Sequence, residues 1–153
     1  SEGYVVPTAI EQAAFADLVQ RLDAADLNRA AGLAAENSYE LARYADRGEG
    51  GAESWLLREL SPIRKGWGLY AFRIQAAHDV IVEAPHPLAD ADTAAIAASI
   101  YRLLHARALL IAGAHRDADA NGAADVAHDV QSVFQAIHAA FSTSARASNS
   151  ASV

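Results

Sequence analysis

One stretch of this chain, residues 79–117, constrains the fold more than any other. It holds two short apolar runs, at 80–82 and 108–112, which are bounded by glycine, proline or charged residues. A histidine follows each run within a few residues, His86 after the first and His115 after the second. Short apolar runs with such boundaries are typical of buried strands. The stretch therefore predicts two strands, each of which leads into a histidine.

The segment between these two strands has the spacing of an amphipathic helix over residues 93–106. The side chains expected to face the sheet are Ile96, Ile100, Leu103 and Leu104. A helical crossover of this length joins parallel strands, and uniformly apolar strands are typical of a parallel sheet covered on both faces. His86 and His115 are therefore expected near one another at the carboxyl edge of the sheet, where open α/β sheets bind ligands.

The N-terminal half predicts helices followed by a hairpin. Thr8 and Glu11 match a capping box, which predicts a first helix over residues 8–24, and helical spacing resumes after a break. The glycines within residues 48–51 separate two runs of bulky side chains. This arrangement favours an N-terminal β-hairpin, although helix is an alternative for both runs.

Together these elements predict an α/β fold with a mixed sheet flanked by helices. The parallel βαβ core comprises strands at about 67–74, 79–85 and 108–114, and the first of these is expected beside the second. Residues 1–141 are interpreted as a single domain, which is large enough for its own core. Residues 142–153 are rich in Ser and Ala and lack bulky apolar side chains, which is typical of a linker or a disordered tail.

A last helix is expected to begin at Asp125, whose side chain can cap it. Its predicted apolar face consists of Val126, Val130, Val133, Phe134, Ile137 and Phe141. Its other side carries a polar stripe of His128, Gln131, Gln135 and His138. Such a stripe is either a solvated helix face or a source of one metal ligand.

Composition excludes several classes of partner. The 153 residues carry a net charge of −7 and no basic stripe, which argues against nucleic acid as a partner. No apolar run reaches the roughly 18 residues of a membrane span.

The chain lacks methionine even at its first position, which fits a secreted, extracellular or periplasmic protein whose signal peptide has been removed. It also lacks cysteine, which excludes disulfides and thiolate chemistry.

The loop after the first βαβ strand carries a candidate metal site. His86 and Asp90 lie on this one loop, and both residue types bind divalent metals. The prolines on either side of His86 favour an extended backbone there. A catalytic zinc ion needs one more protein ligand and an open position for water, and His115 or His128 could supply that ligand.

Three further residues are candidates for the chemistry. Glu83 or Asp92 could act as general base on a metal-bound water, and Arg116 could bind a substrate carboxylate. A structural interpretation stands beside this one. Asp90, Asp92 and Thr93 occupy positions where a helix N-cap is needed, and capping alone could account for them. The histidines could likewise be ordinary surface residues or bonded to turn carbonyls.

Four segments carry a resemblance to a known family: GWGLYAFR, VIVEAPHPLADADT, ALLIAGAHRDA and DVAHDVQSVFQAIH, together about half of the chain. They resemble secreted bacterial zinc amidohydrolases that act on N-formylglutamate or poly-γ-glutamate and share a carboxypeptidase-like α/β fold. In that family a His, an acidic residue and a Thr form the first part of the zinc site on a loop after a strand. His86, Asp90 and Thr93 match this order.

The sequence departs from that family at the last zinc ligand. The family's remaining zinc histidine lies on a later strand, usually before a glycine, and this chain has no His-Gly pair. Three explanations are open. His115 or His128 takes its place, the chain is part of a larger hydrolase-like protein, or the catalytic site has decayed.

Three hypotheses about function follow. The first is a secreted, metal-dependent hydrolase of amide or peptide bonds in acidic small-molecule or peptide substrates. The second is a non-catalytic structural or self-assembling subunit descended from that fold, which would form homo-oligomers. The third is a small-ligand binding module that uses the same sheet edge without metal.

Overall fold

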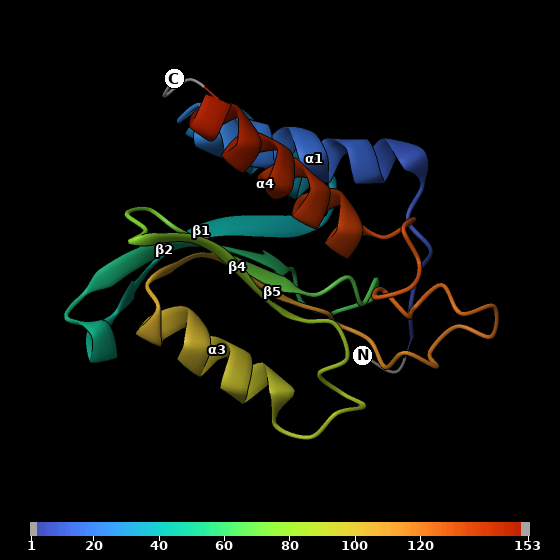
Figure 1. The fold of residues 1–153 in the computed structure, drawn as a ribbon. Coiled ribbons are helices and arrows are strands. Elements are labelled where there is room, and N and C mark those ends of the chain that lie inside the picture. Colours follow the sequence, from blue (N-terminus) through green and yellow to red (C-terminus); the bar gives the residue numbers. More distant parts are fainter. Residues whose placement is uncertain (1–2, 151–153) are drawn as a thin grey trace.

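The chain is an α/β protein with an open mixed sheet, in a computed structural model that describes residues 3–150, with side chains described for 3–144. Helices α1 and α4 cover one face of the sheet and α3 covers the other (Figure 1). The elements in order are α1 (Ala9–Asp23), α2 (Leu27–Glu36), β1 (Tyr39–Asp46), η1 (Arg47–Glu49), β2 (Ala52–Glu59), β3 (Leu69–Arg73), β4 (His78–Ala84), α3 (Thr93–Leu103), β5 (Ala106–Ile111) and α4 (Val133–Ser150). The predicted fold class is confirmed.

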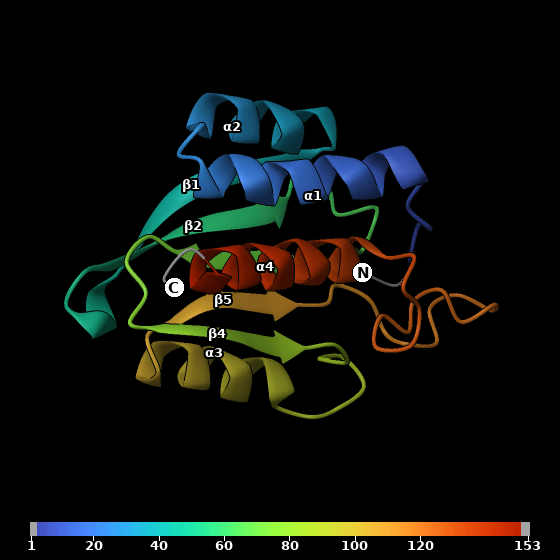
Figure 2. The same cartoon turned by 45° about the horizontal axis from the view of Figure 1, so that its top comes forward.

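The five strands lie in the order β1-β2-β3-β5-β4, with β4 and β5 parallel and the other neighbours antiparallel. The predicted βαβ unit, β4-α3-β5, is therefore confirmed. The expectation that β3 lies beside β4 is wrong, because β5 lies between them. Figure 2 shows β5 next to β4. Burial gives the physical reason. The first three residues of β4 are exposed, which suits an edge strand, whereas four of the six residues of β5 are buried.

The N-terminal predictions are confirmed in detail. The Thr8 and Glu11 side chains form a reciprocal capping box at the start of α1, and Asp26 caps α2. β1 and β2 pair as an antiparallel hairpin along their full length. Gly50 and Gly51 adopt positive φ at its turn, which is a conformation that glycine adopts without strain.

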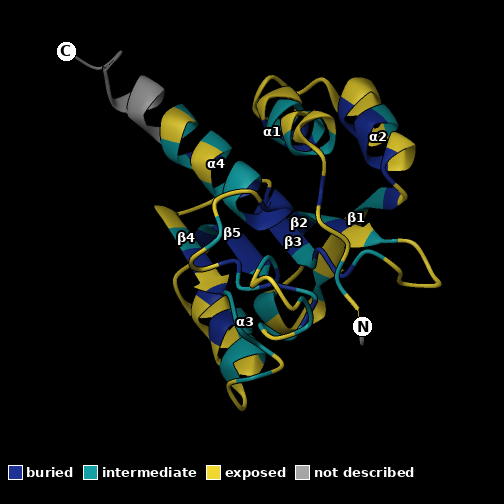
Figure 3. Cartoon of the chain, turned by 90° about the vertical axis from the view of Figure 1, so that its right-hand side faces the viewer, coloured by how far each residue is buried: buried dark blue, intermediate teal, exposed yellow. Residues whose placement is uncertain are grey.

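Most of the core lies between the sheet and the layer of α1, α2 and α4. Phe15 of α1 meets the rings of Tyr39 and Trp67 edge-on, and the two latter rings stack. A smaller apolar cluster lies between the sheet and α3, where Ala97 and Tyr101 are buried. Figure 3 shows the contrast, since exposed residues recur along α3 while the sheet behind it is buried.

The predicted buried face of α3 is wrong. Ala97 and Tyr101 face the sheet, whereas Ile96 is 55% exposed and Leu103 is 81% exposed. Alanine brings the helix backbone close to the strands, and the Tyr101 hydroxyl reaches Ser54 on β2 at 2.7 Å. This hydrogen bond and the close approach set the rotation of the helix and leave its larger aliphatic side chains outside. Ile100 and Leu104, the other two residues of the predicted face, are also exposed.

The last helix begins at Val133 rather than at Asp125, so the predicted polar stripe does not lie on one helix. Val126 is buried within the preceding loop, and Val130 is 77% exposed. The Asp125 carboxylate bonds two histidines, as described below, and does not cap the helix. The stretch interpreted as a tail is helical as far as Ser150, and residues 151–153 lie outside the described residues.

Candidate functional site

His86 lies at the carboxyl edge of the sheet, two residues beyond β4, and its side chain is only 11% exposed. Its Nε2 atom lies 2.7 Å from Oδ1 of Asp125, and its Nδ1 atom lies 3.7 Å from Oδ2 of Asp90. A carboxylate only accepts hydrogen bonds, so the short contact assigns the proton of a neutral imidazole to Nε2. The Nδ1 lone pair then faces Asp90.

The Asp90 side chain is part of this network and does not cap α3. Its Oδ1 accepts a hydrogen bond from Arg116 at 2.8 Å, while its backbone carbonyl accepts one from the Thr93 hydroxyl. Asp92 occupies the N-cap position with φ of 63°, and its side chain makes no capping bond within the described chain. Helix capping therefore does not account for the carboxylate of Asp90.

Asp125 joins two histidines. Its Oδ1 contacts His86, and its Oδ2 lies 3.0 Å from Nδ1 of His128, whose own side chain is 81% exposed. The hydrogen bond from His86, with that from His128, lowers the pKa of the Asp125 carboxyl below its usual value. The sequence pattern predicts only a capping role for Asp125 and does not predict its contacts with the two histidines. The spacing Asp125-x-x-His128 in the loop is the signal that could have identified it.

The other candidates are not brought into this network. His115 is 44% exposed, and its Nδ1 accepts a hydrogen bond from the backbone N–H of Asp117 in its own loop. Glu83 contacts Nδ1 of His138 on α4 at 2.6 Å. The structure thus assembles His86, Asp90, Arg116, Asp125 and His128, which we call the His86 network, and leaves His115, Glu83 and Asp92 outside it.

Two atoms of the His86 network are close enough to bind one zinc ion together. Two ligands at about 2.1 Å from one ion can be up to about 4.2 Å apart, and Nδ1 of His86 and Oδ2 of Asp90 fall within this limit. Asp125 stands where the orienting carboxylate of a metal-bound histidine normally stands. Among the side chains of residues 3–144, however, no group of three or more His, Asp or Glu is placed so that it could hold one metal ion. The third ligand predicted from sequence, His115 or His128, is not in place.

A cavity of about 650 Å³ opens at the same edge of the sheet. Apolar side chains from β3, β5 and the loop after β2 line it, together with Arg58 and Glu59. Its wall includes Ala112, whose N–H donates to the carbonyl of Ala84, the last residue of β4. The cavity therefore opens at the same end of the sheet as the end of β4, but no residue of the His86 network lines it. Its volume suits a small ligand.

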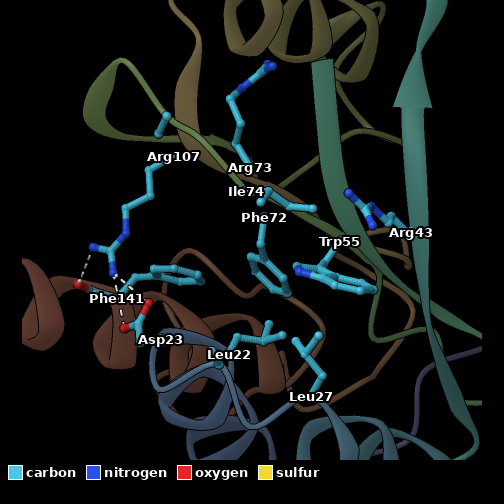
Figure 4. A pocket seen from close by; sticks show the side chains of 12 residues that line it. Leu22, Asp23, Leu27, Arg43, Trp55, Phe72, Arg73, Ile74, Arg107 and Phe141 are labelled. Atoms are coloured by element: carbon cyan, nitrogen blue, oxygen red, sulfur yellow. Dashed lines mark hydrogen bonds and ion pairs between the residues drawn. The ribbon is translucent and has the colours of Figure 1, made fainter. Parts of the chain in front are cut away.

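A second cavity, of about 550 Å³, lies at the opposite edge of the sheet between α1, α4 and the strands (Figure 4). Trp55, Phe72 and Phe141 line it with three arginines. Arg107 pairs with Asp23, Arg43 with Glu53 and Arg73 with Glu49, so all three cations already have acidic partners. Since these charges serve the fold, we place the candidate site at the edge that carries His86.

No protein-family model matches the chain, and no curated protein or solved structure shows significant similarity to it. Among the described residues, no helix is long and apolar enough to cross a membrane.

Proposed function

We propose that this chain is a secreted, metal-dependent hydrolase of amide or peptide bonds in acidic substrates. The observation that carries the proposal is the placement of His86, nearly buried between the carboxylates of Asp90 and Asp125 at the carboxyl edge of the sheet. The resemblance to zinc amidohydrolases supports the same site through His86, Asp90 and Thr93. The neighbouring cavity offers room for a small substrate.

In this proposal His86 and Asp90 would bind the zinc, and His128 or His115 would complete the set after a local rearrangement. A bound zinc ion supplies an activated water and polarises the scissile carbonyl. Asp125 holds the His86 ring through Nε2, which leaves Nδ1 free to bind. Glu83 or Asp92 would serve as the general base. Arg116 lies beside Asp90 and would attract the carboxylate of an acidic substrate.

The first test is the zinc content of the purified chain, measured by elemental analysis after zinc is supplied and excess metal removed. We expect close to one zinc per chain, and at least about a tenfold loss of affinity in His86→Ala and Asp90→Asn. His105→Asn is the matched control, because His105 follows α3 at the opposite edge of the sheet and should keep the metal. The rate at which the chain hydrolyses γ-linked glutamate peptides should fall in the variants that lose zinc.

A wild-type chain that takes up no zinc under these conditions would exclude the proposal. The second candidate, a non-catalytic self-assembling subunit, would then be favoured by the exposed aliphatic side chains of α3. Zinc that remains bound in His86→Ala would instead place the metal elsewhere and remove His86 from the proposed mechanism.

A further inference from the structure

Helix α3 is apolar on both of its sides, which is unusual for a helix that lies on a protein surface. Its inner side packs on the sheet through Ala97 and Tyr101. Outside this face lie Ile96, Ile100 and Leu103, spaced at i, i+4 and i+7, and we call these three the α3 stripe. The α3 stripe contains no charged residue. Helices of this kind are normally covered on both sides.

The α3 stripe lies on the flank of the helix that faces the free edge of β4. On the opposite flank, Arg102 pairs with Asp46 at the end of β1, and Ala98 lines a cavity together with Leu56 of β2. At 100° per residue, the stripe residues lie on the other flank of the helix from these two. β4 is the strand at the far end of the sheet from β1, and α3 lies beside it (Figure 2). The stripe is therefore on the flank of α3 nearer the outer edge of β4.

The outer edge of β4 is open, and the pairing of β4 with β5 is irregular between His78 and Ile81. No strand lies along its outer side among residues 3–150, and its sequence has no proline or lysine. Its two acidic side chains are turned to the α4 side of the sheet, where Asp79 pairs with Arg107 and Glu83 with His138. Val82 packs on the α3 side of the sheet, and Val80, two residues before it, is 40% exposed. The edge and the α3 stripe thus form one continuous surface.

We propose that this surface pairs with the same surface of a second copy, so that β4 adds antiparallel to β4 across a twofold axis. A twofold axis requires a self-complementary patch, and an open strand edge beside an uncharged stripe meets that requirement. The stripe comprises three exposed side chains, whereas a specific interface takes about 20 to 30 residues from each partner. The stripe therefore falls short alone, and the strand edge adds to it in a second copy.

Charge excludes one register of this pairing. With Ile81 on the twofold axis, Asp79 would lie opposite Glu83, and two like charges would face each other. With Val80 on the axis, Asp79 lies opposite Ile81 and His78 opposite Val82. Among the registers without this repulsion, we place Val80 on the axis, opposite its own counterpart, because Val80 is 40% exposed whereas Val82 is buried. This brings the two stripes together on the same side of the extended sheet.

Two tests use the whole chain. The second relies on the absence of native cysteine, so that an introduced cysteine is the only thiol. Sedimentation velocity should give a mass twice the 16.1 kDa of one chain, with dissociation on dilution. The double variant Ile96→Glu with Leu103→Glu should weaken association at least about tenfold while its circular dichroism stays unchanged. The matched control is Ile10→Glu, because Ile10 is 83% exposed on α1 and far in sequence from the stripe.

A second arm tests the register. Oxidised Val80→Cys chains should form a disulfide-linked dimer, since directly opposite residues of antiparallel strands are within disulfide range. Val130→Cys, in an exposed loop, serves as the control and should crosslink more slowly. A chain that stays monomeric at every concentration would overturn the proposal. So would a dimer that survives the double variant, or equal crosslinking of the two cysteine variants. None of these outcomes depends on zinc.

Discussion

Asp125 is the residue on which the His86 network depends. It lies in an irregular loop, yet each of its carboxylate oxygens accepts from a different histidine. These hydrogen bonds favour the charged carboxylate and lower its pKa. The folded pKa is thus below the unfolded value of 3.8. The contribution of these hydrogen bonds to the free energy of unfolding is fully present above the unfolded pKa. It is lost as the pH falls through the folded pKa.

Asp125→Asn is therefore expected to lower the free energy of unfolding at pH 7 by about 1 to 3 kcal/mol, because hydrogen bonds to a charged group are lost. The difference between wild type and variant should shrink on acidification below about pH 4. Urea unfolding at pH 7 and at pH 3 measures both values. Asp117→Asn is the control, since the Asp117 side chain is 81% exposed and should change stability by less than about 0.5 kcal/mol. A difference that is the same at both pH values would contradict the assignment.

At the level of elements, the segment before β3 and the segment after β5 pack closely against each other at Gly68 and Gly113. This contact lies at the carboxyl edge of the sheet. A Cβ on Gly113 would lie 2.5 Å from the backbone N of Gly68 and 2.9 Å from the backbone carbon of Gly66. Real Cβ atoms do not approach backbone this closely, and neither neighbour is a flexible side chain. The close approach of these two loops therefore requires glycine at position 113. The same two loops form part of the wall of the cavity of about 650 Å³ at this edge of the sheet.

Gly113→Ala should destabilise the fold by about 1 to 3 kcal/mol, because the added methyl group forces the two backbones apart. Gly32→Ala is the matched control. Gly32 lies within α2, where an added methyl group would meet open space, so alanine there should stabilise the protein by about 0.5 to 1 kcal/mol. Thermal unfolding of both variants gives the comparison. Equal and small shifts would show that the loops can separate without cost.

At the level of the whole molecule, Arg107 of β5 joins four elements. Its guanidinium bonds Asp23 of α1 at 3.2 Å and Asp79 of β4 at 3.1 Å. It also reaches Ser144 of α4 and lies 4.7 Å from the centre of the Phe141 ring. The side chain is 18% exposed, so these interactions are shielded from much of the solvent. Arg107 therefore holds the helical layer against the edge of the sheet.

Arg107→Ala is expected to lower the free energy of unfolding by about 2 kcal/mol, because several charged hydrogen bonds and the ring contact are lost together. Arg29→Ala removes a solvent-exposed ion pair with Glu36 and should cost less than about 0.5 kcal/mol. Urea unfolding of the two variants at the same ionic strength measures the contrast. If the two variants lose equal stability, Arg107 does not link the layers.

The sequence by itself determined what depends on neighbours along the chain. The capping box of Thr8 and Glu11, the glycine turn of the hairpin and the apolar runs of the βαβ unit are all local patterns, and each element is where its pattern predicts it. The position of His86 at the carboxyl edge also follows, because parallel strands connected by one helix end on the same side. These local features are sufficient to locate the candidate site.

Tertiary structure alone decided which side chains meet. The partner of His86 is Asp125, 39 residues away, and no local periodicity reports a contact across that distance. The rotation of α3 likewise depends on Tyr101 reaching Ser54 on a strand 47 residues earlier. The insertion of β5 between β3 and β4 follows from which strand can be buried on both faces. Contacts of this kind are set by packing of the whole chain, which spacing along the sequence does not record.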